Sequence, residues 1–389
     1  MPRFQKALYA LLICGLLLPC LSLAASCEDF SAISVSAQSA ILIEADSGAV
    51  VYEKNAHKRL PMASTTKLMT ALVAARTAPK DTPITVDARA VGVEGSSIYL
   101  TEGEVLSLEE LLYALLLESA NDAATAIAIG LFGSVEAFAE EMNRTASEIG
   151  LINTHFINPH GLDDEEHYTT AYELAKIARA VLENDWLRLI VSTERITIPQ
   201  GDNKNARLLI NHNKLLRMYD GCIGMKTGFT KKSGRCLVSA AEKNGVRMIA
   251  VTLNAPDDWQ DHTAMLELGF SSFRSVQLAT PEAYCFSLPV VGGSNTQLEV
   301  TNPEGLRITL PARQFTIDTT VELPRFLYAP ITQNETVGYL VFRADLNGNG
   351  IEEELGRIAL VAKQEASVKK AKRKSLWRRI KDLFCKWFG

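Results

Sequence analysis

Three short groups of residues carry side chains that together could cleave an amide bond. They are Ser64-Thr65-Thr66-Lys67, Ser119-Ala120-Asn121 and Lys226-Thr227-Gly228. A serine hydroxyl is a weak nucleophile until a neighbouring base removes its proton. A lysine can be that base once burial or nearby positive charge lowers its pKa. The order of the three groups therefore favours covalent catalysis on a serine.

The first group stands where a helix is expected to begin. An amphipathic run from Leu68 to Ala78 follows it directly. Residues three positions apart share one face of a helix, so Ser64 and Lys67 should point the same way from its first turn. Taken alone, this spacing is also explained by a helix cap beside a surface lysine. The second group, at a helix junction, and the third, on a predicted strand, favour the functional interpretation.

Attack on a carbonyl gives the first two groups distinct expected roles. Ser64 is the nucleophile, and Lys67 is its proton acceptor, which a second cation at Lys226 helps to keep neutral. Ser119 can relay the proton to the departing amine. Asn121 can donate to the substrate amide while it orients Lys67.

The third group should bind the substrate. Lys226 and Thr227 offer positive charge and a hydroxyl to a terminal carboxylate. Gly228 lets backbone and substrate approach closely, so that the substrate can add to the strand edge. The backbone N–H groups of Ser64 and Phe229 are expected to form an oxyanion hole. No cofactor and no metal are needed for this chemistry.

The surrounding segments predict a mixed α/β domain. A hairpin is expected from Ser39 to Tyr52, around the turn Asp46-Ser47-Gly48. Helices are expected over 107–119, 122–130 with Asp122 as its cap, 135–149, 169–182 and 262–273. Short strands are expected over 195–199, 225–229, 237–241 and 248–253. The sheet would then combine strands from opposite ends of this domain.

A second, strand-rich part begins near Leu278, where helical periodicity stops. Short strands separated by Gly, Pro and Asn turns predict a small all-β sandwich, over 286–291, 296–300, 307–310, 315–323, 336–343 and 357–362. The loop from Asp345 to Gly350 begins like a calcium-binding loop. Its twelfth position is Gly356 rather than glutamate, so a plain hairpin turn is expected.

The N-terminus has the pattern of a secretory signal. Two cations, Arg3 and Lys6, precede an apolar run and the small residues Ala24 and Ala25. Cleavage is expected after one of these alanines. The alternatives are an uncleaved membrane span, for which the run is slightly short, and a lipoprotein signal at Cys27, which lacks the usual leucine three positions earlier.

The C-terminal tail differs in charge from the rest of the chain. Residues 367–389 contain nine Lys or Arg and one Asp, whereas the whole chain has a net charge of −5. Apolar and aromatic residues recur every three or four positions: Leu376, Trp377, Ile380, Leu383, Phe384, Trp387 and Phe388. This predicts an amphipathic helix on an anionic membrane surface. The alternatives are a nucleic-acid-binding tail and a coiled-coil helix, but an exported chain rarely meets nucleic acid and the aromatic residues suit lipid, so no nucleic-acid partner is expected.

Length and composition are those of a globular protein with two domains. The chain has 389 residues, of which 47% are hydrophobic and 22% charged. Five cysteines remain beyond the signal, and their wide scatter is unlike a disulfide framework. A bridge between Cys222 and Cys236 is left open by their proximity in sequence.

The chain resembles a known enzyme family in three stretches, Leu60-Pro61-Met62-Ala63-Ser64, Asn158-Pro159-His160-Gly161-Leu162-Asp163 and Gly224-Met225-Lys226-Thr227-Gly228. They are similar to those of serine-type D-alanyl-D-alanine carboxypeptidases, which are low-molecular-mass penicillin-binding proteins of the peptidase S11 type. The same trio of motifs is a recognised mark of penicillin-binding proteins and class A β-lactamases. The resemblance covers nearly the whole chain.

This resemblance implies both an organisation and an activity. The expected parts are a signal (1–24), a transpeptidase-like catalytic domain (25–277), a β-sandwich domain (278–365) and a basic membrane-anchor helix (366–389). The expected reaction removes the terminal D-alanine from peptidoglycan pentapeptide stems, through an acyl-enzyme on Ser64 that water hydrolyses. The resemblance also implies acylation by β-lactams and a location on the extracytoplasmic face of the cell membrane.

Some positions depart from the family pattern. Related enzymes often place an arginine before the third motif, where this chain has Asn211-His212-Asn213-Lys214, so the full set of carboxylate-binding groups is left open. Glu173 stands where an aspartate is common in some members. His160 either lines the cleft or, as we expect, is a turn histidine bonded to backbone.

Three other functions share part of this pattern. An endopeptidase acting on peptide cross-links would carry the same motifs. A β-lactamase would need a loop of the form E-x-x-L-N after Asn121, which the sequence does not contain. A non-catalytic wall-binding protein would be expected to have lost part of a motif, and all three motifs are intact.

Overall fold

The computed structural model describes residues 33–200, 205–346 and 348–369. The predicted signal and nearly all of the predicted anchor helix lie outside the described residues. Within the described ranges, no single helix is long and apolar enough to cross a membrane. Only α4 (Asn121–Phe132) and α5 (Val135–Glu148) pass that test together, as a pair bent by 86°.

An antiparallel five-stranded sheet forms the centre of the catalytic part, in the order β2-β1-β9-β8-β7. Its strands are β1 (Ser39–Glu44), β2 (Val50–Lys54), β7 (Cys222–Thr230), β8 (Gly234–Lys243) and β9 (Val246–Leu253). The N-terminal hairpin pairs with β9 through neighbours such as Ile41 and Val251. The mixed α/β fold, the hairpin and the pairing of strands from opposite ends are therefore as predicted.

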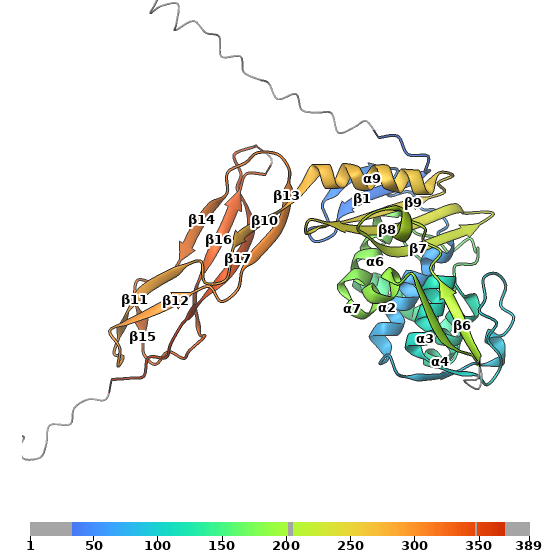
Figure 1. The fold of residues 1–389 in the computed structure, drawn as a ribbon, viewed down its shortest axis with the longest axis horizontal. Coiled ribbons are helices and arrows are strands. Elements are labelled where there is room, and N and C mark those ends of the chain that lie inside the picture. Colours follow the sequence, from blue (N-terminus) through green and yellow to red (C-terminus); the bar gives the residue numbers. More distant parts are fainter. Residues whose placement is uncertain (1–32, 201–204, 347, 370–389) are drawn as a thin grey trace, which may run out of the picture. The chain divides into compact units, whose positions relative to one another are not determined.

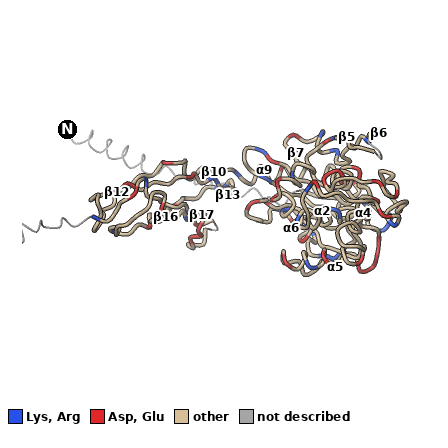
Figure 2. Tube along the Cα trace, turned by 90° about the horizontal axis from the view of Figure 1, so that it is seen from below, with Lys and Arg blue, Asp and Glu red and all other residues tan. Residues whose placement is uncertain are grey.

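Helices cover both faces of this sheet. Figure 1 shows α9 (Asp258–Ser272) on one face and α2 (Lys67–Thr77), α6 (Ala171–Glu183) and α7 (Asp185–Ser192) on the other. Helix α2 is buried over most of its length because the surrounding helices enclose it. The described charges of both signs are interspersed along the chain (Figure 2).

Smaller elements complete the catalytic part. They are η1 (Ala63–Thr66), β3 (Pro83–Thr85), η2 (Ala88–Ala90), β4 (Val105–Ser107), β5 (Arg195–Gln200), β6 (Asn205–Ile210) and α8 (Leu215–Met218). The sequence predicted β5 but none of the β3-β4 pair or β6. Strands β3 and β4 have only three residues each, so they leave little alternation to detect.

The predicted helix over 107–119 is two elements. It begins as α3 (Leu108–Tyr113), where Ser107 and Glu110 form the predicted capping box. It then continues as the π-helix η3 (Ala114–Glu118) and ends at Ser119, whose φ of 63° is left-handed. The extra residue per turn shifts the end of the helix and brings Ser119 to a sharp turn.

The prediction that Asp122 caps α4 is wrong. Ala120 occupies the N-cap position, and no side chain caps the helix there. Asp122 lies within the first turn, where its carboxylate accepts hydrogen bonds from Ser97 Oγ at 2.6 Å and Leu100 N at 3.0 Å. This carboxylate therefore holds the preceding loop rather than the helix end.

The strand-rich part contains a two-stranded and a six-stranded sheet. The first pairs β10 (Phe273–Ala279) with β13 (Leu306–Pro311). The second has the order β14 (Asp318–Glu322), β16 (Thr336–Ala344), β17 (Glu353–Ala362), β12 (Gln297–Thr301), β11 (Cys285–Val291) and β15 (Leu327–Tyr328). All six predicted strands are present, while β10 and β15 were not predicted. The strands therefore begin at Phe273 rather than near Leu278.

Local contacts answer two questions that the sequence left open, a possible disulfide and a possible calcium-binding loop. Cys222 and Cys236 are free thiols, because Cys222 faces Ala241 in the β7-β8 ladder, well away from Cys236. In the loop that resembled a calcium site, the Asp345 carboxylate accepts the N–H groups of Asn349 and Gly350. That arrangement is the expected hairpin turn, although Asn347 lies outside the described residues.

Candidate active site

Ser64 lies in a short 3-10 helix, η1, that leads directly into α2. The neighbouring threonine hydroxyls form hydrogen bonds within this turn. Thr65 Oγ1 donates to the Met62 carbonyl at 2.6 Å, and Thr66 Oγ1 donates to the Ala63 carbonyl at 2.7 Å. Ser64 is thus held half-buried at the start of the helix, with Lys67 on the same side.

Lys67 is fully buried, and its amino nitrogen contacts three oxygens. Nζ lies 2.9 Å from Ser64 Oγ, 2.7 Å from Asn121 Oδ1 and 2.6 Å from the carbonyl oxygen of His160. Burial lowers the pKa of Lys67 well below its usual value, and the charge of Lys226 lowers it further. The predicted influence of Lys226 is therefore present but is the smaller of the two causes.

Asn121 connects this lysine to the loop before the second motif. Its Oδ1 accepts from Lys67, and its Nδ2 donates to the Glu94 carbonyl at 2.5 Å. Gly95 packs so closely that a Cβ there would lie 2.6 Å from Nδ2. The amide is thus fixed in orientation, and one of its two N–H groups is already used by the loop.

The third motif lies on β7, an edge strand of the sheet. Lys226 is 1% exposed, and its Nζ donates to the Thr227 carbonyl at 2.9 Å. Burial lowers the pKa of Lys226 to about 7, against the opposing charge of Glu118. A Cβ on Gly228 would lie 3.0 Å from the Ser64 nitrogen, so a glycine lets this strand approach the serine backbone.

These elements enclose a cleft of about 350 Å³. The predicted residues that line it are Ser64, Ser119, Thr227, Gly228 and Phe229. Lys67, Asn121 and Lys226 lie behind this lining as buried side chains. The structure therefore brings together residues from all three motifs, although Ser64 and Lys226 are more than a hundred positions apart in sequence.

Other residues line the same cleft and had no assigned role. They are Ser96, His212, Lys214, Arg235, Asp258 and Trp259. Arg235 Nη2 donates to Asp258 Oδ1 at 2.7 Å, and the guanidinium carbon lies 5.6 Å from the centre of the Trp259 ring. Arg235 stands directly opposite Phe229 in the β7-β8 ladder. The sequence did not reveal this neighbour, because the observed turn spans residues 231–233, whereas a two-residue turn at Ser233-Gly234 would place Lys232 opposite Arg235.

His212 lies in the segment Asn211-His212-Asn213-Lys214, in the region where related enzymes often carry an arginine. Its Nε2 lies 3.2 Å from Glu118 Oε2, next to the second motif. Burial lowers the pKa of His212, and Lys226 lowers it further. A neutral imidazole beside an acidic side chain is a poor substitute for an arginine, so the second carboxylate-binding cation must come from elsewhere in the cleft.

The loop of His160 supports the serine from behind. The His160 ring accepts a hydrogen bond from the Leu162 backbone at 3.3 Å, as expected of a turn histidine, and burial lowers its pKa to about 3. Its main-chain carbonyl binds Lys67, a contact that the sequence did not predict. Gly161 follows with a φ of 89°, and a Cβ there would lie 1.9 Å from the Ala63 oxygen.

Glu173 has a structural position. Its carboxylate accepts from the backbone N–H groups of Ile152 and Asn153 and from Thr154 Oγ1 at 2.6 Å. The longer glutamate thus joins α6 to the segment that leads into the His160 loop.

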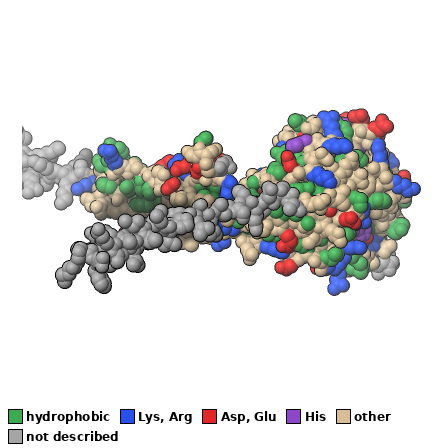
Figure 3. Space-filling view, turned by 90° about the horizontal axis from the view of Figure 1, so that it is seen from above, with side chains coloured by type: hydrophobic (Ala, Val, Ile, Leu, Met, Phe, Trp, Pro, Cys, Tyr) green, Lys and Arg blue, Asp and Glu red, His purple; other side chains and the backbone are tan. Residues whose placement is uncertain are grey.

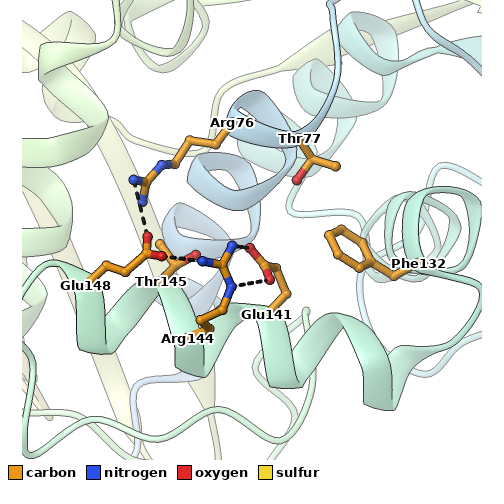
Figure 4. A pocket seen from close by; sticks show the side chains of 7 residues that line it. All are labelled: Arg76, Thr77, Phe132, Glu141, Arg144, Thr145 and Glu148. Carbon is orange, nitrogen blue, oxygen red and sulfur yellow. Dashed lines mark hydrogen bonds and ion pairs between the residues drawn. The ribbon is translucent and has the colours of Figure 1, made fainter.

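A second hollow, of about 480 Å³, lies between α2 and α5. Its charged side chains pair with one another, as Figure 4 shows. Arg144 bonds to Glu141 and Glu148, and Arg76 Nη2 lies 3.4 Å from Glu148 Oε2. Its cations are thus already paired, which distinguishes it from the cleft that holds Ser64. Among the residues that the structure describes, no cluster of His, Cys, Asp and Glu could hold a metal ion.

Comparison with known proteins is consistent with this geometry. Residues 26–257 match the peptidase S11 family model, described as D-alanyl-D-alanine carboxypeptidase. The chain is 33% identical over 325 residues to the D-alanyl-D-alanine carboxypeptidase DacF of Bacillus subtilis, covering 81% of this chain and 83% of that protein. It is 31% identical over 344 residues to DacC of Escherichia coli, covering 84% of each.

Solved structures show the same likeness. The D-alanyl-D-alanine carboxypeptidase DacD from Francisella tularensis has a TM-score of 0.61 at 28% identity, covering 87% of this chain and 95% of its own. Penicillin-binding protein 5 from Haemophilus influenzae has a TM-score of 0.64 at 27% identity, covering 86% and 98%.

Proposed function

The chain belongs to the peptidase S11 family of D-alanyl-D-alanine carboxypeptidases, and we propose that Ser64 is the nucleophile with which it removes the terminal D-alanine from peptidoglycan pentapeptide stems. The observation that carries this role is the 2.9 Å contact between Ser64 Oγ and a buried Lys67 whose pKa is strongly lowered. The same serine would be acylated by β-lactams.

Neutral Lys67 is suited to act as the base. A neutral amine has two N–H bonds and one lone pair. The carbonyl of His160 and Oδ1 of Asn121 can accept both N–H bonds, which leaves the lone pair facing Ser64 Oγ. As Oγ attacks the penultimate D-alanine carbonyl, its proton moves to Nζ and a bond forms between Oγ and the carbonyl carbon.

Collapse of the tetrahedral intermediate breaks the amide C–N bond. The departing amine of D-alanine needs a proton, and Ser119, which lines the cleft beside Ser64, passes it on from Lys67. Water then hydrolyses the acyl ester and regenerates Ser64. The N–H groups of Ser64 and Phe229 are the proposed donors to the oxyanion, supported by the close approach of Gly228 to the Ser64 nitrogen.

The substrate carboxylate would be held by two strands. Lys226 and Thr227 are on β7, and Arg235 is on the neighbouring β8. Arg235 Nε is buried and has no hydrogen-bond partner among the described residues, while Nη2 is fixed by Asp258. A guanidinium already oriented in this way can offer its remaining N–H groups to a carboxylate, so Arg235 is the proposed second carboxylate-binding cation.

The proposed location of the enzyme rests on the sequences of its two terminal segments. The predicted signal, cleaved after Ala24 or Ala25, would export the chain, and the basic tail from residue 366 would bind the membrane peripherally. The boundaries 25–277 and 278–365, and a sandwich arrangement of the second part, belong to the same proposal. A catalytic domain with its own spacer would then act on the wall from the outer face of the membrane.

Labelling and product analysis test the function. The wild-type protein should form an adduct with a fluorescent penicillin, located at Ser64 by mass spectrometry, whereas Ser64→Ala should form none. Ser147→Ala, which removes a hydroxyl on the outer face of α5, is the matched control and should label normally. Digestion of intact muropeptides should release free D-alanine. Cleavage of cross-linked dimers without release of D-alanine would instead identify an endopeptidase.

A further inference from the structure

The last edge strand of the six-stranded sheet exposes two aromatic rings. In β15 and the residue before it, Phe326 is 42% and Tyr328 68% exposed, and their ring centroids lie 5.2 Å apart, edge to face. Leu327 between them is buried in the apolar cluster that contains Leu288 and Val290. The strand thus anchors one side chain in the core and turns two aromatic ones outward.

Two aliphatic residues extend this surface to the point where the described chain ends. Val291 pairs with Tyr328 and is 47% exposed. Val368, 55% exposed, bridges to Gly293, and the next N–H, that of Lys369, donates to the Gly292 carbonyl at 2.8 Å. In Figure 1 the end of the described chain lies beside β11 and β15. Val291, Phe326, Tyr328 and Val368 are called the exit edge below.

Cations accompany the exit edge. Arg325 and Lys369 are exposed immediately before Phe326 and after Val368. The sequence beyond Lys369 carries eight further Lys or Arg and one Asp, together with two Trp and two Phe. Aromatic rings next to cations are typical of surfaces that lie in the interface of an anionic bilayer. Apolar side chains also show on the face of the strand-rich part in Figure 3.

The short length of chain between Val368 and the tail keeps the exit edge close to the surface that the tail binds. Val368 is two residues from Lys370, which corresponds to about 7 Å of extended backbone at most. A tail that lies in a lipid interface from its first residues therefore brings Val368 and its neighbours to the same depth. This constraint favours lipid as the occupant over a glycan or a protein partner.

We propose that the exit edge is itself a membrane-contacting surface, inserted in the interface of an anionic bilayer beside the tail. The inference rests on the proposed binding of the tail to the membrane. The tail supplies the charge and most of the affinity, and the exit edge adds a second contact that belongs to the folded domain. Two contacts fix the tilt of the strand-rich part, which a single point of attachment would leave free.

Vesicle binding of the full chain tests this proposal. Sedimentation with vesicles of anionic and zwitterionic phospholipid would give partition coefficients for wild type, for Phe326→Ser with Tyr328→Ser, and for Val321→Ser. Val321 is 43% exposed on β14, the opposite edge of the same sheet, and is the matched control. We expect the double variant to bind anionic vesicles about tenfold more weakly, because it loses apolar area from the interface, and the control to be unchanged. Penicillin labelling should be normal in all three.

Depth measurements separate this contact from that of the tail. Tyr328→Trp should gain fluorescence quenching by brominated acyl chains relative to Val321→Trp, while the native tryptophans contribute equally to both. Equal quenching, or equal partitioning of the double variant and wild type, would overturn the proposal while leaving the tail as the anchor. A double variant that instead loses binding to isolated cell walls, or loses self-association, would also refute a lipid role.

Discussion

Lys67 Nζ lies 2.9 Å from Ser64 Oγ, and burial strongly favours the neutral form of this amine. Arginine at this position would keep its charge at every accessible pH and could not accept the serine proton. We therefore predict that Lys67→Arg lowers the rate of acylation by about a thousandfold, within the range usual for a lost general base. Stopped-flow measurement with a chromogenic β-lactam checks this. Retention of more than a tenth of the rate would assign the base elsewhere.

The two buried lysines predict a bell-shaped pH profile for kcat/KM on a D-alanyl-D-alanine peptide. The rate rises with pH as Lys67 loses its proton and becomes a base. It falls above about pH 7, where Lys226 loses the charge that attracts the substrate carboxylate. In the profile of kcat the falling limb should move to higher pH, because a bound carboxylate stabilises the charged form of Lys226.

A substrate without the carboxylate provides the control for this profile. For a peptide with an amidated C-terminus, activity should be low and should show only the rising limb. A falling limb near pH 7 that persists with the amidated peptide would exclude Lys226 as its source.

Arg235 should affect recognition of the substrate more than chemistry. A charge-assisted hydrogen bond contributes roughly 1.5–3 kcal/mol, so Arg235→Ala should raise KM about tenfold to a hundredfold with a smaller change in kcat. Arg235→Lys should recover part of the loss, and Asp258→Asn should produce an intermediate effect because it loosens the guanidinium. Kinetics on the free and the amidated peptide measure these changes. Equal losses on both peptides would show that Arg235 is not a carboxylate ligand.

Gly161 should be intolerant of any side chain. Its φ of 89° is left-handed, and a Cβ would lie 1.9 Å from the oxygen of Ala63, the residue before Ser64. Gly103 has a similar φ of 77° but open space around it. A substitution there therefore measures the free-energy cost of the left-handed backbone without a steric clash. We expect Gly103→Ala to lower the free energy of unfolding by about 1 kcal/mol and Gly161→Ala by about 3 kcal/mol or more. Urea denaturation of both variants gives the comparison, and equal losses would contradict it.

His262 should make the protein sensitive to acid. It is fully buried between Ser239 Oγ and Thr252 Oγ1, and burial lowers its pKa to about 3. The unfolded chain binds this proton near its usual pKa of about 6.5, so stability is complete above that pH and is lost as pH falls toward 3. The contribution is roughly 1.4 kcal/mol per pH unit within this window. In His262→Gln, the slope of unfolding free energy against pH should be smaller by that amount, and an unchanged slope would refute the assignment.

Much of the site could be predicted because most of its side chains belong to three short sequence motifs. The spacing of Ser64 and Lys67 predicted their contact, and the structure places them 2.9 Å apart. The alternating and apolar runs predicted the hairpin and β7 to β9. Other contacts left no such mark. The carbonyl of His160 binds Lys67 through a backbone atom, which every residue type carries.

The change from α-helix to π-helix before Ser119 could not be predicted from hydrophobic periodicity. Residues Leu111 to Leu117 are all buried, so a change from α-helix to π-helix alters no apolar periodicity. The left-handed turn at Ser119 was therefore not predictable. The buried pair of Arg207 and Glu104 joins side chains 103 positions apart and has no local signature. The place of Arg235 opposite Phe229 depends on a turn of three residues, 231–233, whose register the sequence did not predict.

The order β2-β1-β9-β8-β7 also sets a constraint on how the chain acquires its structure. The N-terminal hairpin has no neighbour until residues 246–253 are available, about two hundred positions later. Pairings of such long sequence separation form slowly, since a large loop must close before the contact stabilises it. The edge of β1 therefore stays unpaired while the helices and both lysine-bearing motifs emerge. A nascent chain of this protein is vulnerable to aggregation until β9 closes the sheet, and Ser64 gains its full surroundings only then.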